Sequence, residues 1–137
     1  MTDLCIIHDY TSLSLPAERI RKGFSLIKAD HESKIRGEID IIYCSDYRIQ
    51  KLNREYLERD RTTDVIAFPF HEDDLLGEIY VSLQRAKVQA RRFRTTYDSE
   101  VTRLSIHGIL HLLGYKDTAP SEKVSMRNAE DLYLDQI

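Results

Sequence analysis

The chain has 137 residues, of which 42% are hydrophobic and 31% are charged, with a formal net charge of −3 at pH 7. A chain of this length and balance can bury one core without disulfides or a partner, so we expect residues 1–137 to form a single domain. The first residues, MTDLCIIHDY, lack the features of a signal peptide, and no stretch approaches the ~20 apolar residues of a membrane span. We therefore expect a cytoplasmic protein with no membrane partner.

The first half of the chain shows strand-like runs with helix patterns between them. Isoleucine-rich or alternating segments predict strands over residues 3–8, 37–44, 63–68 and 77–82. A helix is predicted over 16–29, starting at Pro16, and another over 47–57, with Asp46 as its N-cap. The polar segment PFHEDDLL separates the last two strands and is typical of a hairpin-like loop.

The segment after the fourth strand predicts a helix with a basic surface. Ser82 is a suitable N-cap, and the helix should run to about Arg94. Its apolar stripe, at spacings of three and four, consists of Leu83, Ala86, Ala90 and Phe93. Positive residues lie off this stripe, namely Arg85, Lys87, Arg91, Arg92 and Arg94. Considered alone, these charges indicate only a solvated helix face.

Two more helices complete the predicted chain. The first, over 99–113 with Asp98 or Ser99 as its cap, is apolar on nearly every side in its second half and should be buried. Gly114 should end it, and the last helix should cover 121–134. The order β-α-β-α-β-β-α-α-α predicts an α+β fold with helices packed on a four-stranded mixed β-sheet.

The buried helix carries two histidines four residues apart. His107 and His111 therefore lie on one helix face, where two imidazoles can bind the same metal ion. Gly114 permits a sharp turn just after the helix, which lets Asp117 reach back as a third ligand. Three protein ligands leave a fourth position open for water, as is typical of a catalytic zinc site. The sequence thus predicts one Zn²⁺ per chain, bound by these three residues.

The same residues admit other interpretations. Two buried histidines can be ordinary core residues, but each then needs a hydrogen-bond partner, which a metal supplies for both. Asp117 can instead cap the turn after Gly114. A group of zinc proteases shares this histidine spacing, but their general base is a glutamate directly after the first histidine. Gly108 occupies that position and cannot abstract a proton, which argues against a protease.

Three segments of the chain resemble one known family. HGILHLLGYKD resembles the signature of the YbeY-type endoribonucleases, also called rRNA maturation factors, which reads His-Gly-x-Leu-His-Leu-x-Gly-Tyr-Asp-His. LNREYLERDRTTDVIAFPF and LLGEIYVS resemble two further segments, so the resemblance covers roughly residues 36–130. It implies an α+β fold, one zinc ion, and single-strand-directed RNA cleavage in small-subunit ribosomal RNA maturation and ribosome quality control. The expected partners are ribosomal RNA and the small ribosomal subunit or its proteins.

Two positions depart from the family pattern. The third ligand is usually histidine in the family, whereas this chain has Asp117, which is also a competent zinc ligand. The family has an arginine directly after the tyrosine of its Leu-Asn…Tyr-Arg segment, where this chain has Leu57. Arg59 is our first candidate to stabilise the phosphate charge in its place, and Glu78 is a candidate proton acceptor.

The resemblance also gives the basic helix a function. Arg85, Arg91 and Arg92 are predicted to contact RNA phosphates, even though the net charge of the chain is mildly negative. Two other function classes stay open. One is a non-catalytic, zinc-containing assembly factor that binds RNA or the ribosome, which Leu57 favours. The other is a metal-dependent hydrolase of a small molecule.

Overall fold

The helices and strands follow the predicted order. The computed structural model describes residues 4–56, 63–70 and 75–137. Its elements are β1 (Leu4–His8), α1 (Ala17–Asp30), β2 (Glu38–Cys44), α2 (Asp46–Tyr56), β3 (Val65–Pro69), β4 (Leu75–Ser82), α3 (Leu83–Arg92), α4 (Tyr97–Leu112) and α5 (Pro120–Leu134). Each predicted helix and strand is present, with small shifts at the ends. None of the helices in these ranges is long and apolar enough to cross a membrane.

The four strands form one mixed sheet in the order β1-β2-β4-β3. β1 pairs with β2, and β2 with β4, in parallel, whereas β3 pairs with β4 in the antiparallel direction. In this register Ile6, Ile41 and Ile79 lie side by side across the parallel strands. The prediction of an α+β fold on a four-stranded mixed sheet is therefore confirmed.

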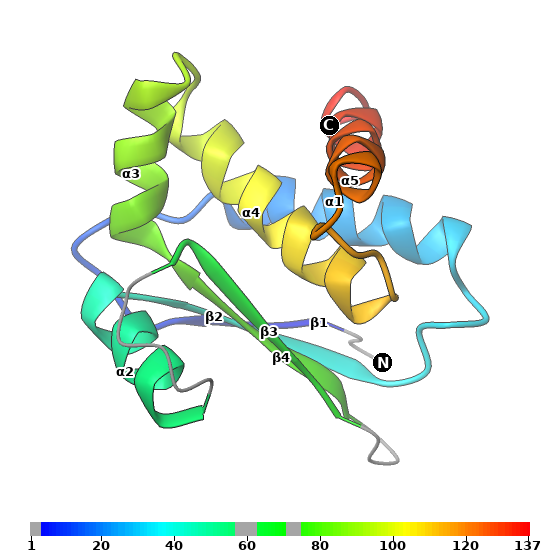
Figure 1. The fold of residues 1–137 in the computed structure, drawn as a ribbon, viewed down its shortest axis with the longest axis horizontal. Helices are drawn as coiled ribbons and strands as arrows, with labels where there is room; N and C mark the ends of the chain where they lie inside the picture. Colours follow the sequence, from blue (N-terminus) through cyan, green and yellow to red (C-terminus); the bar gives the residue numbers. More distant parts are fainter. Residues whose placement is uncertain (1–3, 57–62, 71–74) are drawn as a thin grey trace.

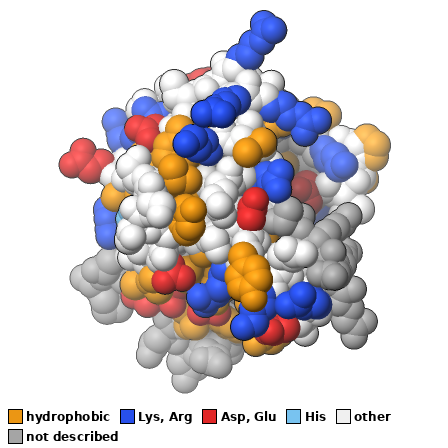
Figure 2. Space-filling view, turned by 90° about the vertical axis from the view of Figure 1, so that its left-hand side faces the viewer, with side chains coloured by type: hydrophobic (Ala, Val, Ile, Leu, Met, Phe, Trp, Pro, Cys, Tyr) orange, Lys and Arg blue, Asp and Glu red, His pale blue; other side chains and the backbone are white. Residues whose placement is uncertain are grey.

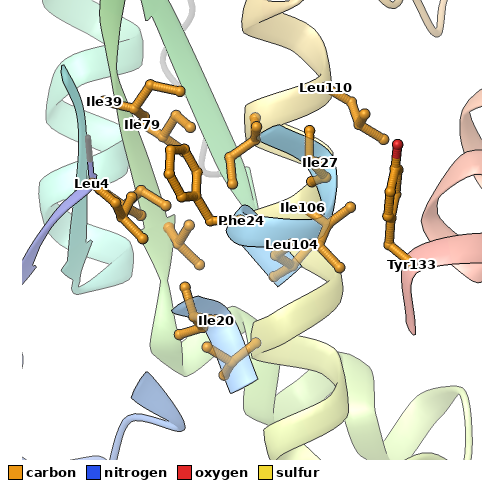
Figure 3. Packing of buried hydrophobic residues seen from close by; sticks show 14 of the residues in the cluster. Leu4, Ile20, Phe24, Ile27, Ile39, Ile79, Leu104, Ile106, Leu110 and Tyr133 are labelled. Carbon is orange, nitrogen blue, oxygen red and sulfur yellow. The ribbon is translucent and has the colours of Figure 1, made fainter. Parts of the chain in front are cut away.

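The helices are distributed unequally over the two faces of the sheet. Helices α1 and α4 cover one face, and α5 packs on both of them, whereas α2 lies on the other face (Figure 1). The main core lies between the sheet and the first group of helices. Figure 3 shows Ile39 and Ile79 of the sheet close to Phe24 of α1, with Tyr133 of α5 at the far side of the cluster.

Helix α4 lies at the centre of this arrangement. It contacts β3, β4, α1, α3 and α5, and most of its length is buried, as predicted. Gly108 lets it approach β4 closely, because a Cβ at this position would lie 2.5 Å from the Cγ2 atom of Ile79. Gly108, which stands where the zinc proteases have their glutamate, thus has a packing role. The close contact fixes α4, and the histidines that it carries, against the sheet.

The two ends of α4 are set by Thr96 and Gly114. The Oγ1 atom of Thr96 accepts a hydrogen bond from the N–H of Ser99 at 3.1 Å, so the helix begins two residues earlier than predicted. The predicted caps, Asp98 and Ser99, lie inside its first turn. Gly114 follows the helix with a φ of 102°, a left-handed conformation that glycine adopts without strain. The predicted end of the helix is therefore confirmed.

Candidate metal centre and adjoining pocket

His107 and His111 project from one face of α4 toward Asp117, which lies in the turn before α5. The centroids of the two imidazole rings are 4.6 Å apart. The carboxylate of Asp117 faces both rings, with Oδ2 3.3 Å from Nε2 of His107 and Oδ1 3.4 Å from Nε2 of His111. The turn at Gly114 thus brings the three predicted ligands together.

The spacing of these atoms suits a shared metal ion. Two ligands bound at ~2.0–2.1 Å to a tetrahedral ion lie about 3.3–3.4 Å apart, which matches the two nitrogen–oxygen separations. The ligand atoms all lie within 4.8 Å of one another, and each of the three residues is partly exposed. The group formed by His107, His111 and Asp117, called the metal-ligand group below, could therefore hold a metal ion with a further position open to solvent.

Each histidine is oriented by a hydrogen bond at its other ring nitrogen. Nδ1 of His107 lies 2.6 Å from Oε2 of Glu130, and Nδ1 of His111 lies 3.0 Å from the carbonyl oxygen of Tyr115. A carbonyl oxygen can only accept, so Nδ1 of His111 donates and its Nε2 keeps the lone pair. Partners of this kind fix the tautomer of a metal-binding histidine and raise its basicity. Both rings therefore offer Nε2 to a common point.

Glu130 belongs to a buried network behind the metal-ligand group. Its side chain is 6% exposed, and its Oε1 accepts a hydrogen bond from Nη1 of Arg103 at 2.9 Å. Nη2 of Arg103 also donates to Asp131 at 2.7 Å. Burial lowers the pKa of His107, but the hydrogen bond to Glu130 and the charges of Glu130 and Asp117 outweigh it, so the pKa is raised overall. The network thus fixes the ring and increases its affinity for a cation.

A pocket of about 270 Å³ opens beside the metal-ligand group. His107 and Asp117 form part of its wall. The rest of the lining combines cationic, acidic, amide and apolar side chains: Arg103, Lys123, Arg127, Asp64, Glu100, Glu130, Gln89, Phe93, Leu104 and Met126. The pKa of Glu100 is raised by its burial, although Arg103 and Arg127 oppose that shift. A ligand in this pocket would meet positive side chains and the metal-ligand group at once.

The predicted RNA-contacting arginines differ in their surroundings. The guanidinium of Arg85 lies 3.3 Å from the carboxylate of Asp46, so its charge is compensated. Arg91 and Arg92 are exposed at the end of α3. Figure 2, which faces the side that carries α2 and α3, shows Lys and Arg side chains gathered over its upper part. Arg91 and Arg92, two of the three arginines predicted to contact RNA, are thus exposed, on a side of the molecule that carries many positive side chains.

Asp46 does not have the capping role predicted for it. Oγ of Ser45 accepts the N–H of Arg48 at the start of α2, at 3.1 Å. The carboxylate of Asp46 instead accepts a hydrogen bond from the hydroxyl of Ser82, at 2.5 Å, in addition to the ion pair with Arg85. Ser82 caps α3 as predicted, since its Oγ accepts the N–H of Arg85 at 3.0 Å. These contacts join α2 to α3.

Of the two predicted catalytic residues, the structure describes only Glu78, which is not brought to the metal-ligand group. Arg59 lies outside the described residues. Ile79 packs against Gly108 of α4, and adjacent residues of a strand point to opposite faces. Glu78 therefore faces away from α4, and it lines a separate pocket of about 220 Å³ with Leu52, Tyr56, Phe68, Phe70 and Tyr80. Glu78 is placed on the wrong face of the sheet to accept a proton at the metal-ligand group.

Sequence reasoning missed the residues that orient His107. Glu130 and Arg103 lie 23 and 4 positions away in sequence, and nothing local joins all three. The available signal was the placement of Glu130 on the apolar face of α5, between the buried residues Met126 and Tyr133. A carboxylate on such a face must find a partner, because an unpaired buried charge is very unfavourable.

A second group of potential ligand atoms lies on the face of the sheet opposite to α4. It consists of Cys5 on β1 and of Glu38 and Asp40 on β2. A side-chain hydrogen bond in which the protonated carboxyl of Glu38 donates to Asp40 is the largest cause that raises the pKa of Glu38. The raised pKa favours the neutral form of Glu38, which is a weaker ligand for a cation than the carboxylate.

Comparisons with known proteins agree with this geometry. The family described as Endoribonuclease YbeY matches residues 9–137. The protein named Endoribonuclease YbeY from Chlorobium phaeovibrioides is 39% identical over 129 residues, covering 93% of this chain and 86% of the relative. Its namesake from Bacteroides fragilis is 38% identical over 135 residues, covering 96% of each.

The fold also matches a solved structure. The solution structure of TM1509 from Thermotoga maritima superposes with a TM-score of 0.65 at 28% identity, covering 96% of this chain and 87% of that one. The fold, the metal-ligand group and the sequence matches over nearly the whole chain agree with one another. The chain belongs to the endoribonuclease YbeY family.

Proposed function

We propose that this protein is a zinc-dependent endoribonuclease that cleaves single-stranded RNA during maturation of small-subunit ribosomal RNA in the cytoplasm. The observation that carries the proposal is the metal-ligand group, in which two oriented imidazoles and one carboxylate converge beside an open pocket. Two imidazole nitrogens with one carboxylate oxygen, and a fourth position left open, are typical of catalytic zinc. The names of the relatives support RNA as the substrate.

The described residues have distinct roles in this proposal. His107, His111 and Asp117 bind the ion, while Glu130 and the Tyr115 carbonyl orient the two rings. When bound, zinc in such a site activates a water molecule and polarises a phosphoryl oxygen. Cationic side chains must then balance the charge that develops on the phosphate.

Candidates for this charge lie on the pocket wall. Lys123 and Arg127 are exposed and line the pocket together with His107 and Asp117. Arg103 is less suited, because its guanidinium already pairs with two carboxylates. Arg59, which lies outside the described residues, stays our candidate for the charge that the family arginine supplies. Replacement of that family arginine by Leu57 favours, as a second candidate function, a non-catalytic assembly factor with the same metal.

One paired assay tests the proposal. The protein is purified without chelators, its metal content is measured by elemental analysis, and its cleavage of a single-stranded oligoribonucleotide is compared with that of the matching duplex. We expect about one zinc per chain, cleavage of the single strand only, and loss of both metal and cleavage in His111→Ala. Bound zinc without cleavage of any RNA would favour the assembly factor. Absence of any transition metal would overturn the whole proposal.

A further inference from the structure

Phe93 is placed in an unusual position for a large apolar side chain. It lies directly after the last residue of α3 and is 56% exposed. The same side chain lines the pocket beside the metal-ligand group, together with His107 and Asp117. The sequence pattern predicts Phe93 in the buried stripe of α3, so its exposure corrects that prediction.

The backbone after α3 explains why Phe93 leaves the core. Arg94 adopts a φ of 54°, the left-handed conformation that often ends a helix. The N–H of Thr95 then bonds back to the carbonyl of Ala90 at 2.9 Å. Ala90 is buried, but the chain turns away one residue after Phe93. The turn therefore leaves the aromatic ring at the rim of the pocket.

The surroundings of the ring are suited to a polyanion with flat apolar groups. Lys123 and Arg127 line the pocket from α5 and are exposed. Arg91, Arg92 and Arg94 are exposed on either side of Phe93 in the sequence. Single-stranded RNA alternates phosphates, which cations bind, with bases whose faces stack on aromatic rings. In a duplex these base faces are occupied by neighbouring pairs.

We infer that Phe93 is a stacking platform for one nucleobase of single-stranded RNA, close to the phosphate that reaches the metal-ligand group. This inference rests on the proposed function and adds a base-binding position to it. The exposed arginines beside Phe93 and the cations of α5 bind the flanking phosphates. Because a stack needs an accessible base face, Phe93 contributes to the preference for single strands.

The first test measures RNA affinity by fluorescence anisotropy at one fixed salt concentration, read within seconds of mixing with zinc-loaded protein. Phe93→Ala is expected to weaken binding about ten-fold, within the ~5–150-fold that a base–aromatic stack contributes. Phe93→Tyr keeps a stacking ring and should bind like the unaltered protein, whereas Phe93→Leu keeps only apolar bulk and should bind weakly. Tyr47→Ala is the matched control, since Tyr47 is 72% exposed on α2 and lies outside the pocket lining.

The second test locates the stacked base. A series of oligoribonucleotides carries one abasic nucleotide at successive positions. The unaltered protein should lose about ten-fold in affinity at one position, and Phe93→Ala should lose nothing further at that position. Zinc content, measured in parallel, should be equal in both proteins.

The outcomes separate this inference from the proposed function. If the unaltered protein cleaves single-stranded RNA and Phe93→Ala binds that RNA as tightly as the unaltered protein does, only the stacking platform is overturned. Equal losses of RNA affinity in Phe93→Ala and Tyr47→Ala would also overturn it. If the unaltered protein neither binds nor cleaves RNA, both proposals fail together.

Discussion

The metal-ligand group, through His107 and Asp117, and the exposed end of α3, through Phe93, line the same pocket but are built in opposite ways. In the first, each ring nitrogen of His107 and His111 has a partner, and Glu130 is buried behind them. In the second, Phe93 and the arginines around it are exposed. The first region is preorganised for one ion, while the second can adapt to a flexible polymer.

This difference indicates how large the effect of a substitution should be in each region. A group held by several buried contacts loses its function when one contact is removed, because the remaining atoms cannot compensate. Exposed cations act additively through long-range attraction and each contributes little. We therefore expect large effects on metal binding in the metal-ligand group and graded effects on RNA binding at the end of α3.

The largest effect is expected for Asp117→Ala. Removal of a direct ligand should weaken zinc binding far beyond the ~10–100-fold typical of residues that only orient a ligand. Asp117→His should restore tight binding, since it supplies another nitrogen donor. Competition with a chelator measures both variants. Full retention of zinc by Asp117→Ala would show that Asp117 only caps the turn after Gly114.

A smaller loss of zinc affinity, ~10–100-fold, is expected for Glu130→Gln. The amide keeps the size of the side chain but loses the negative charge that raises the basicity of His107. Tyr115→Ala is the matched control, because His111 is oriented by the backbone carbonyl at this position, which the substitution keeps. The same chelator competition should show a change of only a few-fold for this control. Equal losses in the two variants would contradict the role assigned to Glu130.

At the end of α3, Arg91→Ala combined with Arg92→Ala should weaken RNA binding several-fold. Removal of two phosphate contacts should also reduce the dependence of log affinity on log salt by about 1.4, since each contact to a single strand contributes ~0.7. Zinc affinity should not change. Binding curves at several salt concentrations measure the slope, and an unchanged slope would show that these arginines form only a solvated face.

The smallest effects concern Gly114 and Arg94, the two residues with positive φ in the part of the chain that the structure describes. Gly114→Ala should lower the free energy of unfolding by about 1 kcal/mol, because φ is 102° there and no atom lies within 4 Å of the added Cβ. Arg94→Gly should raise it by less than about 1 kcal/mol, because relief of the φ of 54° is partly offset by a more flexible unfolded chain. Denaturant unfolding measures both, and changes of the same sign would contradict this account.

Local patterns in the sequence were sufficient to predict the fold and the close approach of the three residues that could hold a metal ion. The spacing of His107 and His111, and the glycine that lets Asp117 turn back, lie within eleven residues. Glu130 was beyond such reasoning, because its contact with His107 depends on how α5 packs on α4. Alternation along β4 shows that Glu78 and Ile79 face opposite ways, but not which of them faces α4. The exposure of Phe93 depends on a left-handed turn at Arg94, a residue type that seldom adopts one.

X-ray absorption at the zinc edge tests the central claim most directly, because it measures the atoms bound to the ion. For the zinc-loaded protein we predict a four-coordinate shell with two imidazole nitrogens at ~2.0–2.1 Å and oxygen donors at ~2.0–2.2 Å. Loss of one imidazole in His107→Ala should be visible in the same spectrum. A shell with a sulfur at ~2.3 Å, or with no imidazole, would contradict the assignment of the ion to His107, His111 and Asp117.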